Sequence, residues 1–290
     1  MEQPLLAARQ SARNGARRHF PVAALYALAP VITVFCAFWL LPFAALTVVG
    51  MQPDGSTHRN AYLVVLTQPQ YLHSLLNTLL LSAAVAIAAV AISAVVACFI
   101  ARHTFMGKGL LLSLLTFPLA LPGVVVGFLI IILAGRQGLF SQLGLALTGE
   151  RWSFAYGMTG LFLGYLYFSI PRVIMTLVAA CEKLDHSLEE AARSLGARQW
   201  RIIRDILIPA LSPALLSSAA ICFATCMGAF GTAFTLGTDL QVLPLTIYGE
   251  FTNYANFATA AALSVVMGLV TWVALLLARR ISGNQSRSML

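Results

Sequence analysis

Residues 189–209 read EEAARSLGARQWRIIRDILIP, and they carry an unusual share of the charge in an otherwise apolar chain. The segment from Glu182 to Pro209 holds ten charged side chains, whereas all 290 residues contain only 18 Lys and Arg and 10 Asp and Glu. Two interpretations are open from this segment alone: a plain solvated loop, or a surface that binds a partner. The sequence on either side of it distinguishes them.

The composition excludes an ordinary soluble domain, in which about a quarter of the residues are charged. Here 59% of the residues are hydrophobic and 10% are charged. Six apolar blocks are each long enough to cross a bilayer as a helix; they cover 22–49, 75–100, 110–134, 158–181, 211–234 and 258–280. We therefore predict an all-α integral membrane protein with one six-helix transmembrane domain at 22–280, an N-terminal tail at 1–21 and a C-terminal tail at 281–290.

The distribution of Lys and Arg predicts the orientation of the chain. Fourteen of them lie in the tails, the 101–109 loop and the 182–209 loop, whereas the loops on the other side hold only Arg59, Arg136 and Arg151. Because cytoplasmic loops carry the excess of positive charge, we expect both termini and the 182–209 loop in the cytoplasm of a bacterial inner membrane protein. The same rule explains the net charge of +8 without a nucleic-acid partner.

The N-terminal arginines Arg9, Arg13, Arg17 and Arg18 precede an apolar stretch of about 30 residues. A secretory signal has a hydrophobic region of about 7–15 residues. This comparison predicts an uncleaved first span rather than a signal peptide.

The charged loop has the pattern of two short amphipathic helices. Ser187 and Glu190 match a capping box at the start of the first helix, and Gly196 is placed as the left-handed residue that ends it. A second helix from about Gln199 would present Trp200, Ile203 and Leu207 on one face, and we expect Pro209 to end it. The loop is therefore predicted to be a helix–turn–helix across the base of the membrane domain.

The same residues resemble a known family signature. Glu190-Ala191-Ala192, three residues, Gly196, nine residues and then Ile206-Leu207-Ile208-Pro209 are similar to the EAA motif of ABC importer permeases, EAA-x3-G-x9-I-x-L-P. Ile208 in place of the usual leucine is the one departure, and it exchanges one apolar residue for another. The resemblance implies a type I importer fold with the MetI-like helix arrangement, in which this loop couples the permease to an ATPase. The coupling residues it implies are Glu190, Ala191, Ala192, Gly196, Ile206, Ile208 and Pro209.

The resemblance also implies a set of partners. They are two ATP-binding subunits that hold ATP and Mg, a second permease that forms a homo- or heterodimer with this chain, a periplasmic or extracellular substrate-binding protein, and the lipid bilayer. The sequence contains no G-x-x-x-x-G-K-[ST] phosphate-binding loop, because Gly107-Lys108 is followed by Gly109. We therefore expect a transport subunit that is not an enzyme and has no cofactor or metal of its own. The five cysteines indicate neither a disulfide framework nor a metal site.

Candidate residues of the transport path lie inside the spans. Arg172 is nine residues before Cys181, which is ~13 Å along a helix. A charge at that depth lines a path or pairs across helices, unless it extends to the cytoplasmic interface or Pro171 ends the span early. Gly228-Ala229-Phe230-Gly231-Thr232 resembles the F-G-T region of permeases for polyamines, ferric iron and phosphonates, which adds Gly228, Phe230, Gly231 and Thr232; close helix packing is the alternative role for these residues.

Glycines and prolines also predict local features of the spans. Pro118, Pro122 and Gly123 predict an interrupted third span, and the pairs Gly123/Gly127 and Gly160/Gly164 predict close helix packing.

Two other function classes require features that this sequence lacks. A self-sufficient secondary transporter or channel requires buried carboxylates or histidines in its spans, and the six blocks contain no Asp or Glu. A membrane enzyme requires a catalytic constellation, and the five histidines are scattered.

The resemblance of the outer loops and the F-G-T region implies a solute such as a polyamine, an aminophosphonate or ferric iron, moved inward by alternating access. The acidic residues Asp54, Glu150, Asp239 and Glu250, with neighbouring tyrosines, suggest an acidic, aromatic outer rim that favours a cationic or zwitterionic solute; an aromatic belt at the interface is the alternative for the tyrosines.

Overall fold

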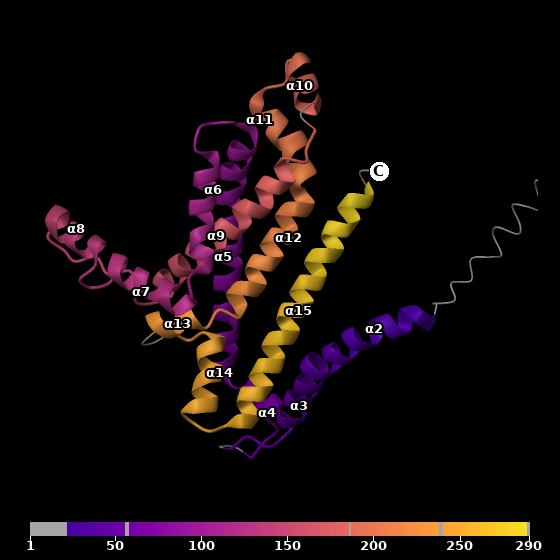
Figure 1. Cartoon of the computed structure of the whole chain (residues 1–290). Coiled ribbons are helices and arrows are strands. Elements are labelled where there is room, and N and C mark those ends of the chain that lie inside the picture. Colours follow the sequence, from indigo (N-terminus) through magenta and orange to yellow (C-terminus); the bar gives the residue numbers. More distant parts are fainter. Residues whose placement is uncertain (1–21, 56–57, 186, 238–239, 289–290) are drawn as a thin grey trace, which may run out of the picture. The chain divides into compact units, whose positions relative to one another are not determined.

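A computed structural model of the chain describes residues 22–55, 58–185, 187–237 and 240–288 (Figure 1). These ranges are mostly helical, and an isolated antiparallel bridge between Pro53 and Asn60 is the only β pairing within them. The all-helical fold predicted from the sequence is confirmed. The N-terminal tail 1–21 with its four arginines and the predicted rim residue Asp239 lie outside the described residues.

The chain divides into two compact units, Met1–Val48 and Val49–Leu290. The first unit contains α2 (Val22–Phe35), the π-helical turn η1 (Cys36–Leu40) and all but the last residue of α3 (Leu41–Val49). Phe35, Trp39 and Phe43 stack along one side of this helix, with ring centroids 5.1 and 5.9 Å apart. Nearly all of its apolar side chains from Leu28 to Val48 are exposed within the chain, as expected of a span that faces lipid.

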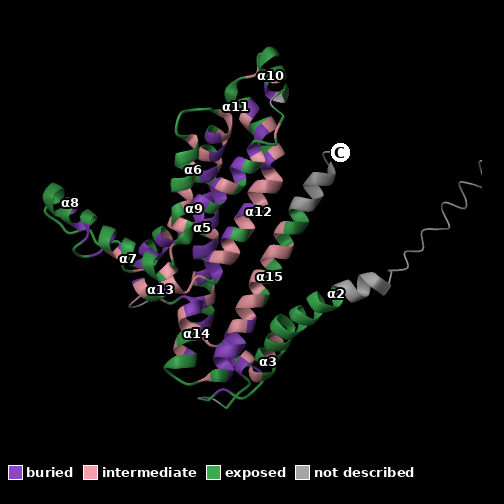
Figure 2. Cartoon of the chain, viewed as in Figure 1, coloured by how far each residue is buried: buried purple, intermediate pink, exposed green. Residues whose placement is uncertain are grey.

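The second unit holds the remaining helices, which form its core. In chain order they are α4 (Ala61–Thr67), α5 (Pro69–Arg102), α6 (Lys108–Thr116), the 3-10 turn η2 (Phe117–Ala120), α7 (Gly123–Ala134), α8 (Leu139–Thr148), α9 (Met158–Cys181), α10 (Ser187–Ser194), α11 (Gln199–Ile202), the π-helical turn η3 (Ile203–Leu207), α12 (Ile208–Met227), α13 (Gly231–Leu236), α14 (Leu243–Thr252) and α15 (Phe257–Ser288). The helices α5, α9 and α12 pack against one another, and the buried residues concentrate along them (Figure 2). Small side chains such as Ala89 and Cys226, both fully buried, allow this close packing.

Six helical segments are long and apolar enough to cross a membrane: Leu28–Val49, Pro69–Arg102, Gly123–Thr148, Met158–Cys181, Gln199–Met227 and Phe257–Ile281. The predicted number of spans is confirmed, but several bounds were wrong. The third block divides at Leu121–Pro122 into α6–η2 and α7, as its prolines predicted, and the apolar segment that follows includes α8. The fifth block, predicted as one helix over 211–234, ends at Met227 and resumes as α13 after a three-residue break. The predicted tail 281–290 continues α15 as far as Ser288.

Both π-helical turns explain how a helix continues through a proline. Pro42 and Pro209 each follow directly after the residue that closes such a turn. Leu41 donates its N–H to the Cys36 carbonyl and Ile208 donates to the Ile203 carbonyl, five residues back in each case. The wider turn moves the preceding carbonyls away from the pyrrolidine ring, which would otherwise clash with the carbonyl four residues earlier. The prediction that Pro209 ends the second loop helix was therefore wrong.

Close backbone contacts hold the broken spans together, as the glycine pairs predicted. A methyl group on Gly127 would lie 2.5 Å from Thr235 Cβ, and one on Gly164 would lie 2.7 Å from Thr232 Cγ2. The Thr232 hydroxyl also donates to the Gly123 carbonyl at 3.0 Å. Glycine at these positions lets α7 and α9 approach α13, which fixes the two breaks side by side.

A buried polar network joins the 50–60 loop to α14 and α15 at the end of the second unit away from α10 (Figure 1). The Asn256 amide donates to Asp54 and, at 3.2 Å, to Glu250. Thr259 donates to Asp54 at 2.8 Å, and the Tyr71 hydroxyl donates to Glu250 at 2.9 Å. Because Asp54 is 0% and Glu250 6% exposed, the prediction that they form an acidic rim was wrong: these carboxylates bind the chain's own donors.

We expect Asn256→Leu to destabilise the protein, because it leaves two buried carboxylates short of a donor. Loss of a buried hydrogen-bond partner costs about 1–3 kcal/mol, which should lower the midpoint of thermal unfolding in detergent. Asn253→Leu, at an exposed position on the same turn, is the matched control. Equal midpoints for the two variants would show that the network does not stabilise the fold.

Candidate functional site

The charged loop is a helix pair that projects from one end of the second unit, between α9 and α12 (Figure 1). Gly196 ends α10 in the left-handed conformation, with φ of +78°. Its N–H donates to the Arg193 carbonyl at 2.9 Å, and the Ala197 N–H donates to the Ala192 carbonyl at 3.0 Å. This is the paired hydrogen-bond pattern of a Schellman motif. The prediction that Gly196 terminates the first loop helix is confirmed.

Two details of the predicted loop were wrong. Ser187 is the first residue of α10 rather than its cap, and its N–H donates to Asp185 Oδ1 at 2.9 Å. The predicted face of Trp200, Ile203 and Leu207 is not a single buried face, since Trp200 is 70% exposed. Ile202 and Leu207 are the residues that pack inward. The continuous helix from α11 into α12 turns these two positions toward the other spans.

The end of the helix pair presents a mixed surface to solvent, coloured as exposed in Figure 2. We name it the tip surface and define it by Glu190, Ala191, Leu195, Gly196 and Trp200, all of which are exposed. Leu195 is 88% exposed and Trp200 70% exposed. These two large apolar side chains lie exposed on an otherwise charged helix pair.

The predicted coupling residues therefore separate into two groups. Glu190, Ala191 and Gly196 belong to the tip surface, and Ala192 is half-buried beside them. Ile206, Ile208 and Pro209 lie lower, in η3 and the first turn of α12. The second group forms the root through which the helix pair joins a span.

An ion pair fixes α10 to the base of α5. The guanidinium of Arg102, the last residue of α5, donates two parallel hydrogen bonds to the two carboxylate oxygens of Glu189. The Glu189 side chain is 6% exposed and that of Arg102 is 19% exposed. Lys108 and Glu182 form a looser pair at 3.6 Å close by. Sequence reasoning missed Glu189, because its partner lies 87 residues away and the pattern drew attention to the neighbouring Glu190.

Thiol groups pack beside this ion pair. Cys98 and Cys181 Sγ atoms lie 3.4 Å apart between the ends of α5 and α9. The five cysteines are all free. Cys98, Cys181, Cys222 and Cys226 fill space between small-residue helices, as predicted, whereas Cys36 is exposed.

A second candidate site is a cavity of about 250 Å³ at the two helix breaks. It is lined by Pro118, Leu119, Leu121, Gly123, Val126, Phe168, Arg172, Ala229, Gly231 and Thr232. Of the residues predicted to line a path, it brings together Arg172, Gly231 and Thr232. Phe230 instead packs on the rings of Phe234 and Tyr248, both 5.2 Å away, and Gly228 ends α12 outside this lining.

The structure excludes the two alternatives that the sequence left open for Arg172, an early end of the span at Pro171 and a side chain that extends to the cytoplasmic interface. Pro171 lies inside α9, which continues to Cys181, so it does not end the span early. The guanidinium donates to Thr225 Oγ1 at 2.9 Å, and Thr225 lies near the end of α12 that is remote from the helix pair. Arg172 is exposed within the chain, but its side chain reaches away from the loop side and lines the cavity at the helix breaks.

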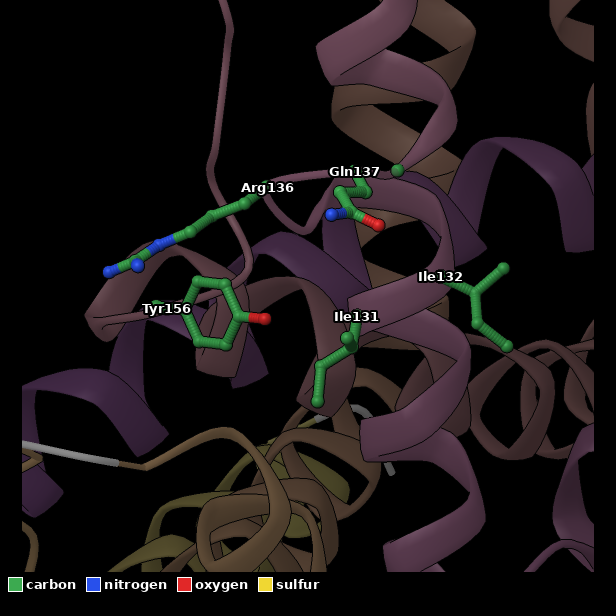
Figure 3. A pocket seen from close by; sticks show the side chains of 6 residues that line it. Ile131, Ile132, Arg136, Gln137 and Tyr156 are labelled. Atoms are coloured by element: carbon green, nitrogen blue, oxygen red, sulfur yellow. The ribbon is translucent and has the colours of Figure 1, made fainter.

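Another cavity, of about 490 Å³, opens beside the turn after α7. Figure 3 shows Arg136, Gln137, Ile131, Ile132 and Tyr156 around it. The Arg136 guanidinium lies 5.7 Å from the centre of the Tyr156 ring, which is cation–π distance. Its charge is already engaged by the ring, and it lies outside the cavity at the helix breaks.

Broken spans around a cavity that contains Arg172, with a charged helix pair projecting from the same domain, define the class: a polytopic transport protein. Comparison with known proteins specifies it. Residues 93–289 match the family of binding-protein-dependent transport system inner membrane components, and the chain belongs to this family. It is a multi-pass inner membrane permease subunit of an ABC importer and not an enzyme.

Named relatives and solved structures agree with this assignment. The chain is 34% identical to sulfate permease 2 of Chlamydomonas reinhardtii over 71% of its length and 57% of the relative. It is 31% identical to the molybdenum transport system permease ModB of Escherichia coli K12, over 74% of its length and 94% of the relative. It also shares the fold of a bacterial alginate ABC transporter crystallised with a periplasmic protein, with a TM-score of 0.75 at 21% identity over 89% of this chain and 94% of that one.

Proposed function

We propose that the tip surface docks on a separate ATPase subunit, so that ATP hydrolysis in the partner drives inward transport by alternating access. The observation that carries this proposal is the helix pair itself. It holds Leu195 and Trp200 out in solvent, while the buried ion pair of Glu189 and Arg102 fixes the same helix to a span. A rigid element held at both ends is what transmits motion from one subunit to the other.

The assembly we propose has two ATP-binding subunits, which carry ATP and Mg, a second permease and a substrate-binding protein. A single chain supplies one helix pair and one set of spans, so a second permease is needed to enclose a path. The excess of Lys and Arg on the loop side supports an orientation with both termini and the helix pair in the cytoplasm. The ATPase is then docked where cellular ATP is available.

For the solute, we propose a molecule that bears a tetrahedral oxyanion group, such as sulfate, molybdate or a phosphonate. The named relatives are permeases for sulfate and molybdenum, and an aminoalkylphosphonate carries the same kind of group. The burial of Asp54 and Glu250 removes the acidic rim that favoured a cationic solute. Polyamines and ferric iron are therefore not the solutes we propose.

The proposal is tested by reconstitution of the complete transporter in proteoliposomes with its binding protein. We expect the ATPase subunits to co-purify with this chain, and uptake of radiolabelled sulfate, molybdate or aminoalkylphosphonate to require internal ATP. Putrescine serves as the cationic comparison. Uptake without ATP would support a secondary transporter, and putrescine uptake in place of the oxyanions would contradict the solute class.

A further inference from the structure

Arg172 is a cation within a membrane span whose described surroundings supply no acidic partner. It lies in α9, nine residues before Cys181, which is ~13 Å along the helix. The ion pairs among the described residues are those of Arg102 with Glu189 and Lys108 with Glu182. The helices around Arg172, from α6 to α7, α9, α12 and α13, contain no Asp or Glu in their sequences.

The hydrogen bond that the structure gives the guanidinium does not neutralise it. Arg172 Nη1 donates to Thr225 Oγ1 at 2.9 Å, and Thr225 in turn donates to the Ile221 carbonyl of its own helix at 2.8 Å. An arginine has five N–H donors in a planar fork that matches an oxyanion in two-point geometry. One donor is engaged here, so the guanidinium retains donors for an anion.

The rest of the cavity lining also favours an anion over a cation. Carbonyl oxygens freed at a helix break are the groups that would coordinate a cation. Here the Gly123 carbonyl accepts from the Thr232 hydroxyl at 3.0 Å, and the Ala229 carbonyl accepts from the Tyr165 hydroxyl at 2.6 Å. The remaining lining is largely apolar, with Phe168, Leu121 and Val126. Arg172 is therefore the charged group of a cavity of about 250 Å³ in which the Gly123 and Ala229 carbonyls already accept hydrogen bonds.

We infer that this cavity is a binding site on the transport path, where the Arg172 guanidinium holds the tetrahedral oxyanion group of the solute between the two broken spans. The inference rests on the proposed function and adds to it a position and a residue. The solute supplies the counter-charge that the spans lack, so each passage transiently neutralises Arg172. A polyamine or a free metal cation would meet an unfavourable charge at the same point.

The test compares Arg172→Gln and Arg172→Lys in proteoliposomes that contain the complete transporter. Arg136→Gln is the matched control, because it removes an exposed guanidinium that lies on the Tyr156 ring outside the cavity. ATP-driven uptake of radiolabelled sulfate, molybdate and aminoalkylphosphonate is measured, and putrescine is the cationic probe. Co-purified ATPase subunits show that each variant has assembled.

We expect Arg172→Gln to lower oxyanion uptake by about tenfold or more, since a charge-assisted hydrogen bond is lost. Arg172→Lys should retain more of the uptake than Arg172→Gln, and Arg136→Gln should match the unmodified protein. If assembled Arg172→Gln retains oxyanion uptake within about twofold of the unmodified protein, far short of the tenfold loss that corresponds to about 1.4 kcal/mol, the site is overturned while the proposed function stays in place. Putrescine uptake by the unmodified protein, with no oxyanion uptake, would overturn both the site and the solute class.

Discussion

Reversal of charge at Glu190, by Glu190→Lys, is expected to abolish ATP-driven uptake and ATPase co-purification while the chain remains inserted in the membrane. Glu190 is exposed on the tip surface, so its replacement removes no internal contact of the fold described here. Loss of a central contact in an interface costs about 2 kcal/mol or more, which is roughly thirtyfold in affinity. Gly196→Asp should have the same effect, because it places a charged side chain at a left-handed position, φ +78°.

The space around Gly196 makes the second substitution informative. A Cβ there would meet no atom of the chain within 4 Å, so the added side chain projects into the region that we assign to the partner. Glu150→Lys, the same substitution at an exposed carboxylate in the loop between α8 and α9, is the control and should transport normally. Full ATPase recovery and normal uptake with Glu190→Lys would show that the partner docks elsewhere.

The ion pair of Arg102 and Glu189 should be required for coupling although it lies beneath the tip surface. Arg102→Glu or Glu189→Arg leaves two like charges facing each other in a poorly solvated position, and disruption of a buried pair costs about 3–5 kcal/mol. Each single variant should lower the solute transported per ATP hydrolysed. The double variant, which restores opposite charges, should recover much of that ratio. The measurement is uptake and ATP hydrolysis in the same proteoliposomes.

The pair of Lys108 and Glu182 provides the comparison for this experiment. Its atoms are 3.6 Å apart and the Glu182 side chain is 51% exposed, and exposed pairs of this kind contribute about 0–1 kcal/mol. Charge exchange at Lys108 and Glu182 should therefore change coupling little. If the two pairs behave alike, or the Arg102/Glu189 double variant recovers nothing, the fixed orientation of α10 does not depend on this ion pair.

The sequence predicted features that depend on local patterns. The number of spans follows from apolar length, and the interruption of the third span follows from Pro122, which forces the preceding residue out of the helical region. The end of α10 just before Gly196 follows because glycine most readily adopts the left-handed conformation that closes a helix. Each of these signals lies within a few residues of its effect, so one sequence is sufficient to see it.

Features that depend on contacts between distant segments were not predictable in the same way. Nothing in the sequence next to Asp54 indicates that Asn256 and Thr259, about 200 residues later, donate hydrogen bonds to it. Nothing next to Glu250 indicates that Tyr71 donates to its carboxylate. The inward and outward roles of Glu189 and Glu190 depend on Arg102 at the end of another helix. Helix continuity through Pro209 depends on a π-helical turn, for which the sequence offers no clear pattern.

Site-directed photo-crosslinking from the tip surface tests the central claim most directly. A benzophenone side chain at Leu195, which is 88% exposed in the turn directly after α10, is compared with one at Leu147, which is 76% exposed in α8. In the assembled transporter, we predict a cross-link from position 195 to the ATPase subunit and none from position 147. A cross-link of equal yield from both positions, or from position 147 alone, would contradict the docking of the ATPase on this helix pair.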